Sequence, residues 1–131
     1  MRDFHRAVSG KATRDDRTWE LQFEMVREGE SYAVLGRLAG RLAAATLVTH
    51  GSRSAYYGVG IYDRELMAQG KPIGHASVFR AILHARSLGL REFLLGEVTV
   101  RGDQKADNIA QFKKGFATRV QSEPRVMIGL A

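Results

Sequence analysis

A glycine-containing stretch, Gly70-Lys71-Pro72-Ile73-Gly74-His75, is the first place in this sequence where residue types and spacing suggest binding chemistry. Glycine lets a ligand approach the backbone closely, and proline fixes the backbone for the first turn of a helix. Unpaired amides at a helix start attract anions, and Lys71 adds a positive charge. The stretch predicts anion binding by Gly70, Lys71, Ile73, Gly74 and His75, and its alternative is an ordinary loop before a helix. In the helix expected over 73–88, one face carries His75, Val78, Phe79, Ile82, Leu83 and Arg86, and its large apolar residues are expected to pack. A packed or capping role is therefore favoured for His75 over a catalytic base.

Lys113 is a second candidate, because of its place on an expected helix. It lies four residues after Ile109 and one after Phe112, so its stem borders the apolar face while Lys114 points away. A cation there can meet a phosphate or polarise a carbonyl. The alternative is a lysine that lies along the surface with its ammonium in water.

Other kinds of reactive site find no support in the sequence. There is no cysteine, and the four histidines lie far apart with no carboxylate at ligand spacing, so no metal site is predicted. No Gly-x-Ser-x-Gly motif occurs, and Gly58-Val59-Gly60 matches neither a phosphate-binding loop nor a dinucleotide fingerprint.

The positive charge is concentrated in the middle of the chain. The formal net charge is +6, and residues 31–91 carry all of this excess, with eight Lys or Arg against Asp63 and Glu65. These cations are spaced singly, whereas a segment that wraps nucleic acid is a dense basic run. The pattern favours a smaller anionic ligand over nucleic acid, and a solvated face that aids solubility is the alternative.

The apolar pattern indicates a mixed α/β protein. It predicts an antiparallel meander followed by helix, strand, helix and strand, with the central sheet flanked by helices. The expected helices are 3–11, 15–29, 73–88 and one opening at Asp103 or Asp107, and the expected strands are 31–38, 41–50, 53–62, 91–98 and one from Arg119 or Arg125 towards Leu130. At 131 residues, the chain is expected to form a single domain over residues 1–131. No run of apolar residues suits a membrane span and no signal peptide is evident, so we expect a cytoplasmic protein.

Three motifs and this order of elements resemble the FemAB-like branch of the GNAT acyltransferase superfamily. The first motif is the paired aromatics of Ala55-Tyr56-Tyr57-Gly58. The second is Gly74-His75-Ala76-Ser77-Val78-Phe79, which is followed by a unit of helix, glycine, short strand and glycine over residues 85–96. The third is Phe112-Lys113-Lys114-Gly115-Phe116. The resemblance covers about residues 18–118. It implies transfer of an acyl or aminoacyl group from a thioester or similar activated donor to an amine or hydroxyl. Family members are often about twice as long as this chain and contain two such modules. This chain corresponds to one module, so the resemblance allows a homodimer in which a second copy supplies the other.

The resemblance also implies where the reaction takes place. The strands through Tyr57 and Leu94 should part at their ends and leave a slot for the thioester arm, whose anionic tail would rest against Gly74. Glu97 is the carboxylate expected near this fork, where it would remove a proton from the nucleophile. Tyr57 is the expected hydrogen-bond donor to the leaving thiolate, and Lys113 is a further cation. The alternatives are a solvated charge at a strand end for Glu97 and core or edge packing for Tyr57.

The donor and the activity itself each have alternatives. Ordinary GNAT enzymes hold coenzyme A with a Gln/Arg-x-x-Gly-x-Gly/Ala loop, whereas this chain has Ala68-Gln69-Gly70-Lys71-Pro72-Ile73-Gly74 there. The expected donor is acyl-coenzyme A, with a carrier protein or an aminoacyl-tRNA as the other sources of the acyl group. The competing function is a non-catalytic GNAT-like module that binds an acidic partner, either RNA or a carrier protein.

Overall fold

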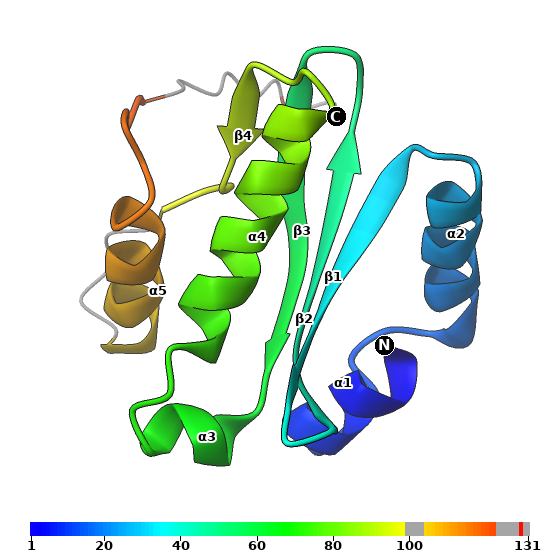
Figure 1. The fold of residues 1–131 in the computed structure, drawn as a ribbon, viewed down its shortest axis with the longest axis vertical. Coiled ribbons are helices and arrows are strands. Elements are labelled where there is room, and N and C mark those ends of the chain that lie inside the picture. The colour runs from blue at the N-terminus through cyan, green and yellow to red at the C-terminus, as the bar shows by residue number, and fades with distance from the viewer. Residues whose placement is uncertain (99–103, 123–128, 130–131) are drawn as a thin grey trace. The chain divides into compact units, whose positions relative to one another are not determined.

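The structure, a computed structural model, describes residues 1–98, 104–122 and 129. The chain forms two compact units, residues 1–96 and 97–131. The first unit contains, in order, α1 (Arg2–Ser9), α2 (Asp16–Arg27), β1 (Ser31–Leu38), β2 (Arg41–His50), β3 (Ser54–Tyr62), α3 (Arg64–Ala68), α4 (Ile73–Ser87) and β4 (Glu92–Leu94), as Figure 1 shows. The second contains α5 (Gln104–Lys114). The mixed α/β class, with a meander followed by a helix and a parallel strand, is confirmed.

Helix α2 begins and ends as its sequence predicts. The Asp15 side chain accepts hydrogen bonds from the Thr18 hydroxyl at 2.6 Å and from the Thr18 amide at 2.7 Å, and both lower the pKa of that carboxyl. Gly29 follows the helix with a φ of 78°, a conformation that favours glycine. Trp19 and Phe23 lie four residues apart on this helix, and Trp19 is buried whereas Phe23 is 64% exposed.

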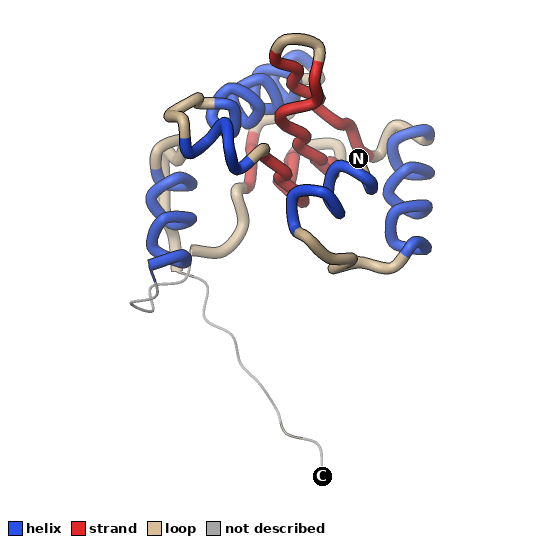
Figure 2. The backbone as a smooth tube through the Cα atoms, turned by 90° about the horizontal axis from the view of Figure 1, so that it is seen from below, coloured by secondary structure: helices blue, strands red, loops and turns tan. Residues whose placement is uncertain are grey.

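The sheet has the strand order β1-β2-β3-β4, with antiparallel pairing in the meander. Strand β2 is buried on both faces, because α1 and α2 cover one and α4 covers the other (Figure 2). Trp19 packs with Leu47 and Ile61 on the first face. On the second face, Val48 packs with small residues of α4. The core therefore lies on both sides of β2.

Helix α4 contacts the sheet through small residues, which corrects the expected packing face. Its buried residues are Gly74, Ser77, Val78, Ala81 and Ala85. Of the large apolar residues expected to pack, Phe79 is 54% and Leu83 is 37% exposed. Small side chains bring the helix close to the sheet. The helical period is right, but the buried face is rotated from the one that the large residues suggested.

A short helix, α3, precedes α4 and was not predicted. The Asp63 carboxylate accepts hydrogen bonds from the amides of Glu65 at 3.0 Å and Leu66 at 3.1 Å, which caps this helix. An aspartate followed by Arg-Glu-Leu-Met-Ala is a recognisable helix start, so the signal was present in the sequence. No helix in the described part of the chain is long and apolar enough to cross a membrane.

The last two predicted strands differ from the structure. Strand β4 covers Glu92–Leu94, shorter than the expected 91–98. Residues 119–122 are not in a strand, so a strand starting at Arg119 is wrong, whereas residues 123–128 and Leu130 lie outside the described residues. A helix start at Asp103 also lies outside the described residues. Helix α5 runs from Gln104, so a start at Asp107 is wrong.

Candidate functional site

Strands β3 and β4 pair in parallel over three residue pairs and then separate. The partners are Ser54 with Glu92, Ala55 with Phe93, and Tyr56 with Leu94. Strand β3 continues to Tyr62, but β4 stops at Leu94. Among the described residues, no strand pairs with this edge of β3 from Tyr57 onwards. Backbone groups on such an edge can pair with an extended chain that carries amides.

Local sequence explains why the two strands part. In the pairing of β2 with β3, Leu47 faces Val59 and Val48 faces Tyr57, so Gly58 is an extra residue in β3. Such a bulge bends a strand and increases its twist. After β4 the chain turns at Gly96, where φ is 76°. The fork expected between the strands through Tyr57 and Leu94 is therefore present in the first unit.

A chain of four hydroxyl groups lies on the α4 face of the sheet. The Tyr57 and Tyr62 hydroxyl oxygens are 2.9 Å apart, and Tyr62 is 3.3 Å from Thr46 Oγ1. Thr46 Oγ1 is in turn 2.8 Å from Ser77 Oγ on α4. Thr46 is fully buried and Ser77 is 4% exposed. The chain thus joins β3, β2 and α4 through polar contacts inside the core.

Tyr57 and Tyr62, the two tyrosines among these hydroxyl groups, remain neutral at physiological pH. Burial raises the pKa of Tyr57 strongly, and the neighbouring Tyr62 raises it further. Burial also raises the pKa of Tyr62, while its hydrogen bonds to Thr46 and Tyr57 lower it. The Tyr57 hydroxyl can therefore give a hydrogen bond, but it is a poor source of a transferable proton.

The predicted anion-binding loop connects α3 to α4. Gly70 has a φ of 74°, and the Lys71 amide donates to the Leu66 carbonyl at 3.0 Å. Pro72 is the N-cap of α4 and provides no side-chain cap, and the first turn contains no acidic residue. Lys71 is exposed, Ile73 is half-buried and Gly74 is buried. This arrangement leaves a helix start next to an exposed cation, as the sequence predicted.

His75 is exposed in the first turn of α4. The expectation that it packs is therefore wrong, whereas a capping role stays a prediction. Ser77, two residues further along the same helix, joins the hydroxyl chain. Helix α4 therefore begins just after Lys71 and also contributes Ser77 to the chain of hydroxyl groups.

Glu97 and Lys113 lie in the second unit. Lys113 Nζ donates a hydrogen bond to the Glu97 carbonyl oxygen at 2.7 Å. Lys113 is half-buried, and burial lowers its pKa, whereas Lys114 is exposed. The Glu97 side chain is exposed. The structure therefore brings Glu97 and Lys113 together, and it places Tyr57 and the loop residues in the first unit.

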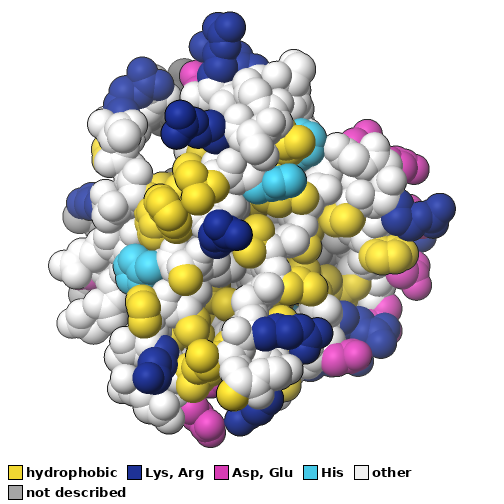
Figure 3. All heavy atoms as spheres, viewed as in Figure 1, with side chains coloured by type: hydrophobic (Ala, Val, Ile, Leu, Met, Phe, Trp, Pro, Cys, Tyr) yellow, Lys and Arg dark blue, Asp and Glu magenta, His cyan; other side chains and the backbone are white. Residues whose placement is uncertain are grey.

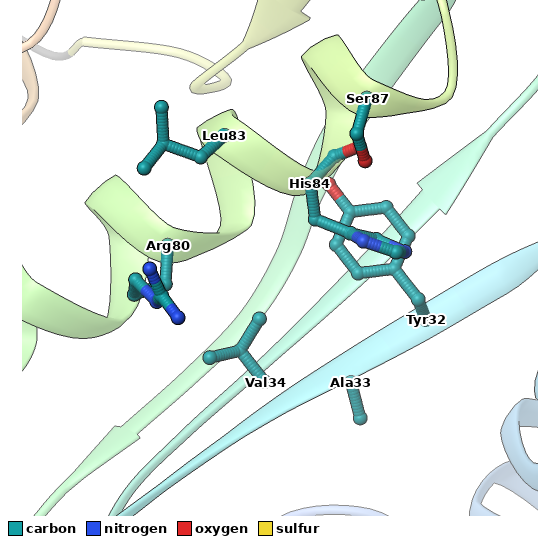
Figure 4. Close-up of a pocket in the computed structure, with 7 residues that line it drawn as sticks. All are labelled: Tyr32, Ala33, Val34, Arg80, Leu83, His84 and Ser87. Carbon is teal, nitrogen blue, oxygen red and sulfur yellow. The ribbon is translucent and has the colours of Figure 1, made fainter.

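Two hollows in the first unit contain none of the predicted site residues. One, of about 440 Å³, lies between β1 and α4 (Figure 4). Tyr32, which lines it, donates a hydrogen bond from its hydroxyl to the Ala81 carbonyl at 2.7 Å. Burial raises the pKa of Tyr32 to about 12. The other, of about 570 Å³, lies against Trp19 and Phe23. Because neither hollow contains residues of the α3–α4 loop, neither supports the predicted anion site. That prediction depends on the α3–α4 loop and on the separation of β3 from β4.

The charge distribution on the surface agrees with the pattern along the chain. Figure 3, which looks onto the α4 side, shows Lys, Arg and His among hydrophobic side chains there, while most acidic side chains lie towards α2. Helix α4 carries Arg80 and Arg86 and no carboxylate. No group of three or more metal-ligating side chains was found within the described residues.

Comparison with known proteins supports the architecture. No protein-family model matches the sequence, and no curated protein matches it. Among solved structures, an aminoglycoside acetyltransferase from an uncultured soil metagenomic sample, in complex with sisomicin, matches with a TM-score of 0.69 and 14% identity. That match covers 98% of this chain and 85% of the other.

Two further acetyltransferases show the same similarity. A ribosomal-protein-alanine N-acetyltransferase from Brucella melitensis biovar Abortus 2308 matches with a TM-score of 0.62 and 13% identity, over 98% of this chain and 89% of the other. Glucosamine-6-phosphate N-acetyltransferase from Arabidopsis thaliana matches with a TM-score of 0.56 and 16% identity, over 90% and 82%. The chain has the fold of the GNAT acetyltransferases.

Proposed function

We propose that this protein is an N-acyltransferase that moves an acyl group from a thioester donor, acyl-coenzyme A, to an amine. The observation that carries the proposal is the separation of β3 and β4 after three residue pairs, in a fold that known acetyltransferases share. The edge of β3 beyond Tyr56 offers backbone groups to the amide-bearing arm of coenzyme A. The α3–α4 loop, with Lys71 and the start of α4, suits its phosphates.

The reaction needs few groups from the protein. The amine nitrogen attacks the thioester carbonyl and loses a proton, the carbon–sulfur bond breaks, and the sulfur leaves as a thiolate. A thiol has a pKa of about 8.5, so the released thiolate can take its proton from water. In our proposal Glu97 accepts the proton of the amine, Tyr57 stabilises the thiolate, and Lys113 polarises a carbonyl or meets a phosphate.

Several finer assignments remain predictions. The motifs around Tyr57, Gly74 and Lys113 favour the FemAB-like branch, and the acetyltransferases named above do not test it. An aminoacyl-tRNA or a carrier protein remains the alternative donor, because the α3–α4 loop departs from the usual coenzyme A loop. The single domain over residues 1–131, the cytoplasmic location and the homodimer are also predictions, and light scattering in solution tests the last.

Ligand-induced stabilisation tests the proposed function. We expect acetyl-coenzyme A at 100 times its dissociation constant to add about 2.7 kcal/mol to the free energy of unfolding. Free coenzyme A and an acyl carrier protein are the comparison ligands, and release of free thiol with a panel of primary amines reports transfer. Absence of both stabilisation and thiol release would favour the non-catalytic module. In that case RNA or an acidic carrier protein should bind with a steep dependence on salt.

Replacing Lys71 by alanine is expected to weaken acetyl-coenzyme A binding about two- to fivefold, the range for one exposed charge next to a helix start. Isothermal titration calorimetry measures the dissociation constant. The matched control is Lys114→Ala, since that lysine is also exposed but lies on α5. Equal loss of affinity in both variants would indicate a general effect of charge and would remove Lys71 from the donor site.

A further inference from the structure

Strand β1 lies at one end of the sheet, with β2 between it and β3. One edge of β1 pairs with β2, and no strand among the described residues pairs with its other edge, which we call the free edge. Proteins usually protect such an edge with charged residues or proline, and residues 31–36 of β1 contain neither. The free edge is therefore suited to pairing with a further strand.

The hydrogen bonds between β1 and β2 show which backbone groups the free edge presents. The His50 amide donates to the Glu30 carbonyl at 2.9 Å, where the pairing of the two strands begins. In an antiparallel pair such bonds recur at every second residue, so residues 32 and 34 also bond to β2. Ala33 and Leu35 lie between these positions and direct their amides and carbonyls to the free edge.

The two hollows of the first unit flank this edge, one on each face of the sheet, and Ala33 lines both of them. The hollow of about 440 Å³ lies on the α4 face, towards which the Val34 side chain is directed, whereas that of Ala33 is directed away from α4 (Figure 4). The hollow of about 570 Å³ lies on the α2 face, beside Leu35. Consecutive side chains of a strand point to opposite faces, so a strand paired with β1 would place its side chains alternately in the two hollows.

The hollow on the α2 face suits large apolar side chains. Its wall is formed largely by apolar residues of α2, β1 and β2, namely Trp19, Phe23, Val26, Leu35 and Leu47. Phe23 is 64% and Leu35 is 53% exposed, so a side chain that enters would remove apolar surface from water. Charged side chains at its rim are already in ion pairs, those of Arg2 with Asp3 and Asp16 and that of Glu20 with Arg17.

The hollow on the α4 face is different, because it is lined by the cationic side chain of Arg80 and by His84. The His84 ring packs against the edge of the Tyr32 ring, with the ring centres 4.5 Å apart. None of the residues that line this hollow is acidic, and α4 contains no carboxylate. A carboxylate that enters would therefore meet a guanidinium group without an opposite charge in the hollow, which favours an acidic side chain there.

We propose that the free edge of β1 binds an extended peptide of a partner protein in which large apolar and acidic residues alternate. The peptide backbone pairs with Ala33 and Leu35. Its apolar side chains enter the hollow against Trp19 and Phe23, and its acidic side chains meet Arg80. Backbone hydrogen bonds provide affinity, and the two hollows provide the sequence preference. This site is separate from the proposed donor site and does not depend on acyl transfer.

A second copy of this chain fits the free edge less well than such a peptide. If two copies paired through β1, each strand would supply side chains to the hollows of the other. Strand β1 contains no acidic residue to pair with Arg80, and its one charged residue is Arg37. The charge of the hollow on the α4 face therefore favours a different protein as the partner.

Fluorescence anisotropy with a labelled synthetic peptide, Ser-Leu-Glu-Leu-Glu-Leu-Ser, tests the charge preference. We expect Arg80→Glu to raise the dissociation constant about five- to twentyfold, because an attraction becomes a repulsion. Replacing both glutamates of the peptide by lysine should restore binding to this variant. The matched control is Arg86→Glu, which changes an exposed arginine of α4 outside the hollow. Equal loss of affinity in the two variants would overturn the acidic preference.

The same assay tests the apolar hollow with Phe23→Ala. Loss of this exposed ring should raise the dissociation constant of the peptide about threefold to tenfold, because less apolar surface is covered on binding. Leu21→Ala is the matched control, since Leu21 is 44% exposed on the same helix but does not line the hollow. Unchanged affinity in Phe23→Ala would contradict the proposed placement of the peptide.

Amide hydrogen exchange followed by NMR tests the strand pairing itself. We expect the amides of Ala33 and Leu35 to exchange fast in the protein alone and at least about tenfold more slowly with the peptide. The amides of Tyr32 and Val34, which bond to β2, should be protected in both states. A peptide N-methylated at the amides that face β1 should give no protection. Slow exchange of Ala33 and Leu35 without peptide would show that this chain or a second copy covers the edge, and would overturn the proposal.

Discussion

Replacing Gly60 by alanine is expected to lower the free energy of unfolding by about 2–4 kcal/mol and to slow acyl transfer, because Tyr57 has to move. The added methyl group would overlap the Tyr57 hydroxyl and crowd that of Tyr62. Both rings would have to move, and Thr46 would lose its contact with Tyr62. Denaturant unfolding measures the stability, and release of free thiol measures the transfer.

Gly58→Ala is the matched control for stability. Gly58 lies on the same strand, but a Cβ there meets only the Leu47 carbonyl oxygen at 3.5 Å, an ordinary contact. We expect its loss of stability to be clearly smaller than that of Gly60→Ala. If the two alanine variants are equally stable, the Tyr57 and Tyr62 hydroxyl groups do not lie against Gly60, and the geometry of the four linked hydroxyl groups is wrong.

The second large effect is expected at Glu97. Replacing it by glutamine keeps the shape of the side chain but removes the carboxylate that, in our proposal, accepts the proton of the amine. General-base catalysis contributes about 10²- to 10⁴-fold, so we expect kcat to fall by at least about 100-fold. The dissociation constant of acetyl-coenzyme A should stay the same, because no part of the donor site is assigned to this carboxylate. Steady-state kinetics and calorimetry measure the two quantities separately.

Lys113→Met is the companion to Glu97→Gln, because Lys113 Nζ donates to the backbone carbonyl of Glu97. It should lower kcat less than Glu97→Gln does, since the carboxylate remains. Wild-type turnover in Glu97→Gln would show that another group takes the proton. Glu97 would then be the solvated charge at a strand end that the sequence also allowed.

The elements predicted well are those determined by nearby residues. Helix α2 was predictable because Asp15 caps it and Gly29 ends it. The meander was predictable because alternating apolar residues are separated by short turns. The order of elements then implied a parallel strand after α4, and β4 confirms it. Its short length was not predictable, because Leu95 continues the apolar run before the turn at Gly96.

The orientation of α4 depends on tertiary contacts and was therefore missed. The sequence suggested that Phe79 and Leu83 face the core, because large apolar residues usually gain most from burial. The structure instead buries the row of small residues that contains Ala81 and Ala85. The distance between helix and sheet decides between the two faces, and no local pattern in the sequence reveals it.

The candidate site was predictable only in part. The fork at Tyr57 and the loop at Lys71 followed from motifs, and the structure places both in the first unit. Thr46 and Ser77 were missed, because they lie 31 positions apart and meet only when α4 packs on β2. A threonine within the otherwise apolar run Leu42–Val48 was the one available signal, since a buried hydroxyl requires a partner.

Titration of the isotope-labelled protein with coenzyme A, followed by backbone amide NMR shifts, tests the donor site most directly. We expect the strongest shifts in two segments, residues 57–62 of β3 and residues 70–76 at the start of α4, with weaker shifts elsewhere. Shifts confined to the hollow around Arg80 and His84, or no saturable shifts at all, would contradict a donor site between the unpaired edge of β3 and the start of α4.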